Sequence, residues 1–193
     1  MNAATMTKPA DDPDLELMTR WRAGDARAAE QLTRRYHGVM RQFYATKVRP
    51  GEVDDLVQQV WVALAEAQGR GAEVRTSLRA YIYGIARHVL FAHLRARHRQ
   101  MAVDPIESSI AALEPSLSQM VGQRVQAQRM MLALQGLPVD TQVLLELRYF
   151  TSLSTAELAA LYEVPTGTIK SRLSAARKSL ERAMGQRLDG PAR

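Results

Sequence analysis

The stretch Ser152–Met184 constrains the fold most, because it reads as two short helices with a sharp turn between them. Ser154 stands three residues before Glu157, the spacing of a capping box, in which a hydroxyl and a carboxylate satisfy free amide groups at a helix start. This first helix is predicted to run from Ser154 to about Tyr162. Pro165 then forces a break, because the residue before a proline is pushed away from helical angles. The proline itself fits the first turn of a second helix.

The second helix has one narrow apolar face. At about 100° per residue, this face collects Ile169, Leu173, Ala176 and Leu180. Small residues, hydroxyls and long cations fall opposite or on the flanks: Gly167, Lys170, Ser171, Arg172, Ser174, Lys178 and Arg182. Such a helix can lie in a DNA major groove, with cations on phosphates and small polar side chains near base edges. A solvated surface helix is the alternative, and the capped helix and tight turn before it favour DNA binding.

Composition limits the other possibilities. The chain has 193 residues, of which 46% are hydrophobic and 24% charged, typical of a folded soluble protein. Its net charge of +6 favours a polyanionic partner. The lack of cysteine excludes disulfides, thiolate zinc sites and thiol catalysis. No apolar run approaches the roughly 18 residues of a membrane span, and the N-terminal residues lack a signal-peptide core, so a cytoplasmic location is expected.

Helical patterns extend along the rest of the chain. Further helices are predicted from near Pro13 to Gly24, from Asp25 to about Lys47, over Val53–Gln68, from Ser77 to Arg99, from about Ser116 to Gln135 and over Val139–Phe150. Asp11, Asp12, Asp14 and Glu16 stand at the start of the first of these helices, where acids interact favourably with the positive end of the helix dipole and need no functional explanation. We find no strand-period alternation of useful length. The fold class is therefore predicted to be all-α, with two small helical domains, residues 12–100 and 119–185, a flexible linker at 101–118 and flexible tails at 1–11 and 186–193.

The helix ending at Arg99 has a lopsided charge. The helix contains no acid and five arginines: Arg79, Arg87, Arg95, Arg97 and Arg99. Aromatic and histidine side chains are interleaved with these arginines. Aromatic rings that stack on bases, next to arginines that follow the backbone, suit single-stranded nucleic acid. The alternative is that Tyr81 packs in the core and the arginines are simply solvated.

Three segments, in this order, resemble one family. DLVQQVWVALAEA (Asp55–Ala67) and LRAYIYGIARHVLFAHLRARHR (Leu78–Arg99) resemble the second conserved region of bacterial sigma factors. The run LPVDTQVLLELRYFTSLSTAELAALYEVPTGTIKSRLSAARKSL (Leu137–Leu180) resembles the fourth region. Order, spacing and the short linker match the compact two-domain group, the extracytoplasmic-function sigma factors. The resemblance extends from about Asp12 to Met184.

The resemblance implies a docking site for the coiled coil of the largest polymerase subunit, at a DLxQ pattern. The matching positions are Asp55, Leu56 and Gln58, followed by Gln59, which departs from the acid often found there. A carboxylate and an amide three residues apart on a helix can jointly meet arginines and polar groups of a partner helix. An acidic helix start that merely caps itself is the alternative.

The resemblance also implies two DNA contacts. The segment Arg75–Arg99 matches the part that captures and melts the minus-ten element, with the loop Gly69–Thr76 reading a flipped base. The candidates there are Arg75, Arg79, Tyr83, Arg87, His88 and Arg95. His88 and Ala92 stand where the family often has Asn and Asp, which leaves the recognised base open. The residues expected near the minus-thirty-five element are Pro165, Thr166, Thr168, Lys170, Ser171 and Arg172. Arg177 and Lys178 are expected to contact phosphates.

The sequence thus predicts a dissociable specificity subunit that brings polymerase core to promoters, without catalysis, cofactor or metal. The family also implies an anti-sigma partner. A stand-alone helix-turn-helix regulator would leave the Asp55–Ala67 segment and the arginine-rich helix unused. An enzyme is disfavoured, because steps of five residues put His88, His93 and His98 on different helix faces, and neither HExxH nor a glycine-rich phosphate loop occurs.

Overall fold

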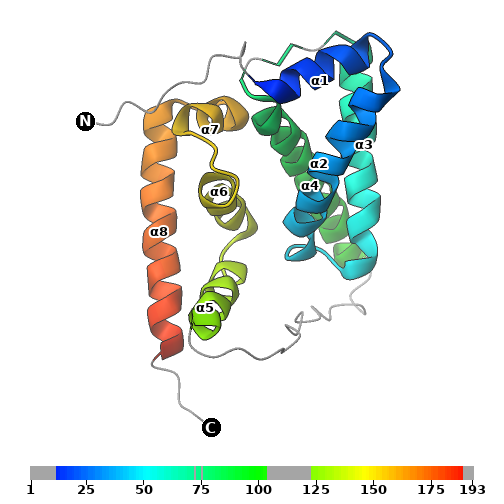
Figure 1. Cartoon of the computed structure of the whole chain (residues 1–193). Helices are drawn as coiled ribbons and strands as arrows, with labels where there is room; N and C mark the ends of the chain where they lie inside the picture. The colour runs from blue at the N-terminus through cyan, green and yellow to red at the C-terminus, as the bar shows by residue number, and fades with distance from the viewer. Residues whose placement is uncertain (1–11, 72, 75, 104–122, 189–193) are drawn as a thin grey trace, which may run out of the picture. The chain divides into compact units, whose positions relative to one another are not determined.

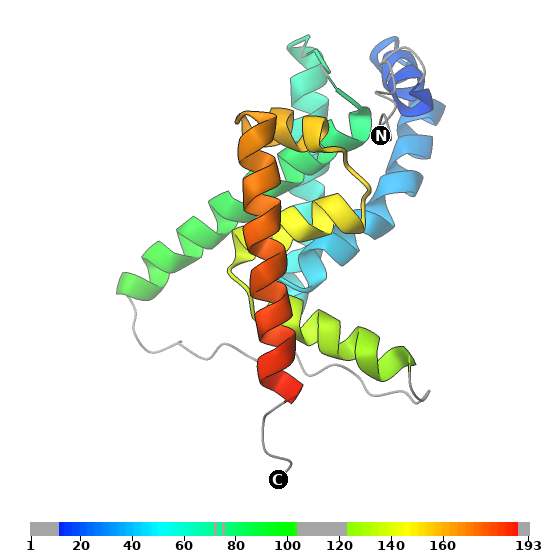
Figure 2. The same cartoon turned by 90° about the vertical axis from the view of Figure 1, so that its left-hand side faces the viewer.

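The described part of the chain is built from helices (Figures 1 and 2). The computed structural model describes residues 12–71, 73–74, 76–103 and 123–188. In chain order the elements are α1 (Pro13–Arg22), α2 (Ala26–Ala45), the short 3-10 turn η2 (Pro50–Glu52), α3 (Val53–Gly69), α4 (Leu78–Val103), α5 (Gln123–Gln135), α6 (Val139–Tyr149), α7 (Thr155–Tyr162) and α8 (Thr166–Leu188). Within these ranges no strand occurs, and the predicted all-α class is confirmed.

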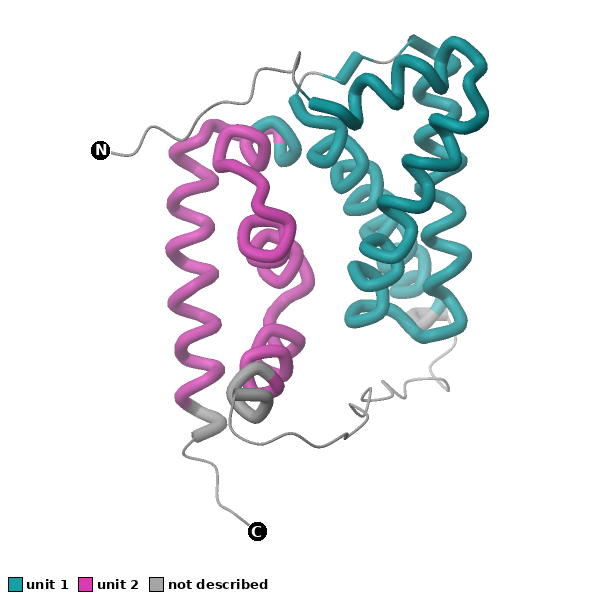
Figure 3. Tube along the Cα trace, viewed as in Figure 1, with its two compact units in different colours: residues 1–109, 160–162 teal, residues 110–159, 163–193 magenta. Residues whose placement is uncertain are grey.

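The chain divides into two compact units (Figure 3). The first comprises residues 1–109 and 160–162, and the second residues 110–159 and 163–193. Two domains were predicted, and their exact boundaries stay a prediction. The tail 1–11, most of the linker, the last residues 189–193 and the expected helix start at Ser116 lie outside the described residues. α4 ends at Val103, four residues beyond the predicted end.

The first unit is a bundle in which α1 packs on α2 and α4, while α3 packs on α2 and α4. Its largest fully buried side chains include Leu32, Met40, Leu56, Leu64 and Ile82. Tyr36 is buried between Leu32 and Met40, and Val60 between Leu56 and Leu64, so buried side chains recur every four residues along one face of α2 and of α3. Tyr44 ties α2 to α4, because its hydroxyl donates a 2.9 Å hydrogen bond to the carbonyl oxygen of Ala86. Burial raises the pKa of this Tyr44 hydroxyl.

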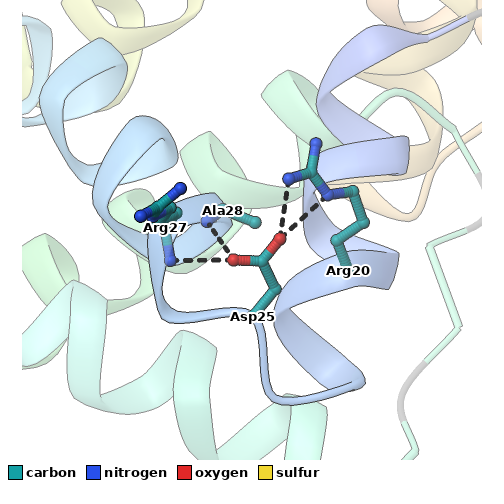
Figure 4. A network of polar contacts seen from close by, with 4 residues as sticks. All are labelled: Arg20, Asp25, Arg27 and Ala28. Atoms are coloured by element: carbon teal, nitrogen blue, oxygen red, sulfur yellow. Dashed lines mark hydrogen bonds and ion pairs between the residues drawn. The ribbon is translucent and has the colours of Figure 1, made fainter.

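Asp25 joins α1 to α2 (Figure 4). One carboxylate oxygen accepts the backbone N–H groups of Arg27 at 2.9 Å and Ala28 at 3.3 Å, which caps α2. The other oxygen accepts Nε and Nη2 of Arg20, at 3.0 and 2.7 Å. The Arg20 guanidinium, helped by the α2 amides, holds the pKa of the Asp25 carboxyl below its ordinary value.

This lowered pKa predicts how stability depends on pH. Because the folded chain binds the Asp25 proton more weakly than the unfolded chain, the stabilisation is present above the unfolded pKa and is lost as the pH falls through the folded one. Asp25→Asn keeps a side chain that can cap α2 but removes the charge. We expect the native chain to be more stable than Asp25→Asn near about pH 6, and the difference to shrink towards about pH 2.5. Urea unfolding of both proteins across this range measures it, and a difference independent of pH would contradict it.

The second unit has its own core, in which α5 and α6 pack on α8 and on each other. Leu134, Leu145 and Ala176 form the centre of this core, and the partly buried Leu137 and Leu180 pack against it. α5, α6 and α8 therefore each contribute an apolar side chain to one cluster. This cluster anchors α8, the helix that carries the predicted DNA-contacting residues.

Candidate nucleic-acid interface

The capping box at the start of α7 is present. The Ser154 backbone N–H donates to the Glu157 carboxylate at 2.8 Å, and the Glu157 backbone N–H donates to the Ser154 hydroxyl oxygen at 3.1 Å. Both bonds are local and depend only on the three-residue spacing, which is why the sequence alone predicts them.

The turn between α7 and α8 has left-handed backbone at Glu163, with φ 54°. The Val164 N–H reaches back to the carbonyl oxygen of Ala159 at 3.0 Å, the bond that closes a Schellman-type helix end. Pro165 directly precedes the first helical residue, and its carbonyl oxygen accepts the N–H groups of Thr168 and Ile169 at 2.9 and 3.2 Å. The break before Pro165 is as predicted, although the proline stands one residue before α8 instead of within its first turn.

The left-handed conformation of Glu163 predicts that glycine at this position stabilises the folded protein. A glycine adopts this conformation without the steric cost that a β-carbon brings. We therefore expect Glu163→Gly to raise the free energy of unfolding by about 1 kcal/mol. Glu181→Gly is the matched control, because Glu181 is exposed within α8, where glycine should lower stability by about 1 kcal/mol. Urea unfolding compares the two, and a loss of stability in both would show that the turn does not strain Glu163.

α8 separates a buried face from an exposed basic face. Ile169, Leu173 and Ala176 are buried, as predicted. Among the predicted minus-thirty-five residues, Thr168 is half-buried. The others are exposed: Pro165, Thr166, Lys170, Ser171, Arg172, Arg177 and Lys178. α8 has a single acid along its length, Glu181, so its exposed surface is strongly positive.

Two side chains of α8 have local hydrogen bonds that limit their orientation. The Ser171 hydroxyl donates to the carbonyl oxygen of Thr168 at 2.9 Å, which leaves its oxygen to accept from a base or phosphate group nearby. The Arg182 guanidinium donates to the carbonyl oxygen of Lys178 at 3.3 Å and to the Ser179 hydroxyl at 3.2 Å. These two bonds direct Arg182 along the helix.

The predicted docking segment lies on α3, and its residues divide between surface and core. Asp55, Gln58 and Gln59 are exposed. Leu56 is only 1% exposed, so it holds α3 in the bundle instead of meeting a partner directly. Val62 is 50% exposed one turn after Gln58 and was missed by the sequence analysis. Its position three and four residues after the glutamines was the available signal, because it places Val62 on the same helix face.

The predicted minus-ten residues on α4 also divide. Arg79, His88 and Arg95 are exposed, and the half-buried Arg87 lies over the Phe91 ring, 4.9 Å from its centroid. Tyr83 departs from the prediction, since it is 5% exposed and its ring meets the Phe43 ring edge-on at 5.8 Å. Tyr83 therefore packs in the core of the first unit, as its helical spacing from Ala80 and Ala86 explains. Arg75 lies outside the described residues.

Within the described residues, neither a metal-binding cluster nor a membrane-spanning helix is found. Across these ranges, no group of three His, Asp or Glu side chains is placed to share a metal ion. Nor is any helix in these ranges both long and apolar enough to cross a membrane.

These features define a helical DNA-binding protein with a helix-turn-helix unit and a second unit that carries an arginine–aromatic helix. Two family descriptions match the chain, Sigma-70 region 2 over residues 28–100 and Sigma-70, region 4 over residues 127–180. The chain belongs to the sigma-70 family, in its extracytoplasmic-function group, whose members direct RNA polymerase to promoters.

Curated relatives match over nearly their full length. RNA polymerase sigma-H factor of Pseudomonas aeruginosa is 26% identical over 190 residues, covering 90% of this chain and 94% of the relative. ECF RNA polymerase sigma-E factor of Escherichia coli K12 is 26% identical over 182 residues, covering 87% and 92%. The stand-alone regulator is not favoured, because region 2 and region 4 occur together in one chain.

Two solved structures share the fold. CnrH, in complex with the cytosolic domain of CnrY, has a TM-score of 0.66 and 20% identity, covering 93% of this chain and 100% of its own. The sigma factor RpoE of Bartonella quintana, in complex with the anti-sigma factor NepR, has a TM-score of 0.64 and 25% identity, covering 81% and 96%.

Proposed function

We propose that this chain brings RNA polymerase core to its promoters through three surfaces: the polar face of α3, the basic α4 and the exposed face of α8. The observation that carries the proposal is the occurrence, in one chain, of an exposed α3 face with the DLxQ pattern and a capped helix-turn-helix with a basic α8. A protein that only bound duplex DNA would need the second feature alone. The boundaries 12–100 and 119–185 are proposed for the two domains that carry these surfaces.

The α3 face is proposed to bind polymerase core. Asp55 and Gln58 point to one side of the helix, because residues three apart are neighbours on a helix surface. Their carboxylate and amide suit arginine and polar groups of a partner helix. Gln59 extends the polar surface, Val62 adds an exposed apolar side chain, and the buried Leu56 fixes the helix beneath them.

The basic α4 is proposed to capture the opened minus-ten strand. Arg79, His88 and Arg95 are exposed along it, and Arg87 lies beside them on Phe91. Binding of an unstacked base and of the adjacent phosphates offsets the few kcal/mol that unstacking costs. The loop Gly69–Thr76, with Arg75, is proposed to read the flipped base. Capture of the strand and reading of the base are non-covalent, so the protein is proposed to act without catalysis and to need no cofactor or metal.

α8 is proposed to read the minus-thirty-five element in the major groove. Its first turns present small and hydroxyl-bearing side chains to base edges, while Arg177 and Lys178 are placed for phosphates. The core residues Ile169, Leu173 and Ala176 lie on the opposite side of α8, and the cations Lys170, Arg172, Arg177 and Lys178 are exposed.

The solved structures of similar proteins suggest how the chain is regulated. CnrH is bound to the cytosolic domain of CnrY, and RpoE to the anti-sigma factor NepR. We propose that an anti-sigma protein likewise binds this chain in the cytoplasm and releases it on a signal. With no cysteine in this chain, any thiol-based sensing would reside in that partner.

Transcription in vitro from a library of genomic fragments tests the proposed function. Core polymerase with this chain should yield defined transcripts that core alone does not, while the chain alone should bind none of the recovered promoters tightly in a gel-shift assay. Tight, sequence-specific binding to duplex DNA without polymerase, together with no new transcript, would instead identify a stand-alone regulator.

A further inference from the structure

Asp12 caps two helices that are far apart in the sequence. Its Oδ1 accepts the backbone N–H of Asp14 at 3.0 Å, which caps α1. Its Oδ2 accepts the backbone N–H of Leu78, the first residue of α4, at 2.9 Å. The Ser77 hydroxyl accepts the backbone N–H of Ala80, in the same first turn, at 3.2 Å. The start of α4 is thus held by one local side chain and one side chain from the beginning of α1.

A second polar contact of α1 involves Asp14, which is 5% exposed. Its carboxylate accepts the hydroxyl of Tyr36 and pairs with the guanidinium of Arg35, both on α2. Burial raises the pKa of the Tyr36 hydroxyl, and the neighbouring Arg79 guanidinium, which hydrogen-bonds it, acts in the opposite direction. Arg79, in the first turn of α4, therefore belongs to a network that includes a carboxylate of α1.

We propose that Asp12 is a positioning residue for promoter opening, because it fixes the start of α4 and, with Asp14 and Tyr36, the direction of Arg79. This role rests on the proposed function of α4 and extends it to residues that the sequence analysis explained by the helix dipole alone. Asp12 lies outside the candidate DNA contacts, so it acts through α4 and not on the DNA itself.

The chemistry of a carboxylate explains why aspartate suits this position. A carboxylate accepts hydrogen bonds on both oxygens, whereas the asparagine amide accepts on one and donates from the other. Asp12→Asn can still cap α1, but its NH2 group would face the Leu78 N–H, donor against donor. Asp12→Ser can also cap α1 and leaves the Leu78 N–H without its charged acceptor. Both variants therefore remove the contact to α4 selectively.

The first test needs no transcription. In the full chain, amide hydrogen exchange at residues 78–81 should become at least about tenfold faster in Asp12→Asn and Asp12→Ser, because a hydrogen bond to a charged group is lost. Exchange in α3 should stay unchanged. Asp25→Ala is the matched control, since it removes an aspartate whose hydrogen bonds run to α1 and to the start of α2. Native exchange rates at residues 78–81 in both Asp12 variants would overturn the proposal.

The second test measures opening with the polymerase complex. A promoter recovered in the transcription experiment carries 2-aminopurine in its minus-ten non-template strand, and its fluorescence reports strand opening. We expect opening to fall about tenfold in both Asp12 variants, while affinity for core polymerase, measured by anisotropy, stays native. Native opening in Asp12→Ser, or an equal loss in Asp25→Ala, would overturn the positioning role.

The two tests distinguish a failure of the proposed function from a failure of the positioning role of Asp12. If the native chain gives no promoter-dependent opening with core, the proposed function fails, and the exchange experiment still decides whether Asp12 holds α4. If Asp12→Asn also loses core affinity, its fold is damaged, and Asp12→Ser, which lacks the donor–donor clash, decides the outcome.

Discussion

Replacing Asp55 and Gln58 together by alanine is expected to weaken the binding of this chain to RNA polymerase core about a hundredfold. A hydrogen bond to a charged group contributes roughly 1.5–3 kcal/mol and a neutral one about 1 kcal/mol, and every 1.4 kcal/mol is a factor of ten in affinity. Both side chains are exposed, whereas Leu56 between them is buried. The double variant should therefore remain folded, and its free energy of unfolding should change by less than about 0.5 kcal/mol. Fluorescence anisotropy of labelled protein titrated with core measures the affinity.

The control for this interface is Glu30→Ala with Gln31→Ala, which removes the same two chemical groups from the exposed surface of α2. Glu30 forms an exposed ion pair with Arg34 on its own helix, so the control should be nearly neutral for stability. It should also bind core normally. Equal affinities for the Asp55/Gln58 variant and the native chain would place the core contact elsewhere. Val62→Ala then reports whether the exposed apolar side chain of α3 takes part.

Replacing Lys170 and Arg172 by alanine is expected to reduce promoter-dependent transcription about tenfold or more, and to make the remainder less sensitive to salt. Each phosphate that a cation neutralises contributes about −0.9 to the slope of log K against log salt, because bound counterions are released. Two lost phosphate contacts should therefore flatten the slope by about two. Transcript yield and promoter affinity of the polymerase complex across a salt series measure both effects.

Arg27→Ala with Arg34→Ala supplies the charge-matched control. Both arginines are exposed on α2, in the other unit, and their removal lowers the net charge of the chain by the same amount. If the effect came from the overall positive charge, this control would lose affinity and salt dependence equally. If Lys170 and Arg172 contact DNA, the control should keep the native slope. An unchanged slope in the Lys170/Arg172 variant would remove both residues from the contact list.

The features predicted most accurately from the sequence are those that depend on neighbours along one helix. The capping box joins Ser154 and Glu157, which are three residues apart in the sequence. The buried stripe of Ile169, Leu173 and Ala176 follows from helical periodicity. The resemblance to sigma factors likewise came from the sequence, through three segments and their order along the chain. Exposure was predicted less well, because Tyr83 belongs both to an arginine-rich helix and to a helix face that packs on α2. Only the position of the Phe43 ring decides between the two.

The sequence by itself therefore determined the helices, the capping box of Ser154 and Glu157, the basic face of α8 and the family. The tertiary structure decided which side chains meet across the chain. Asp12 and Leu78 are 66 residues apart, and no local pattern predicts that one carboxylate caps both α1 and α4. The physical reason is that periodicity and capping act within a few residues, whereas the partner of a buried or bridging polar group depends on how separate helices pack.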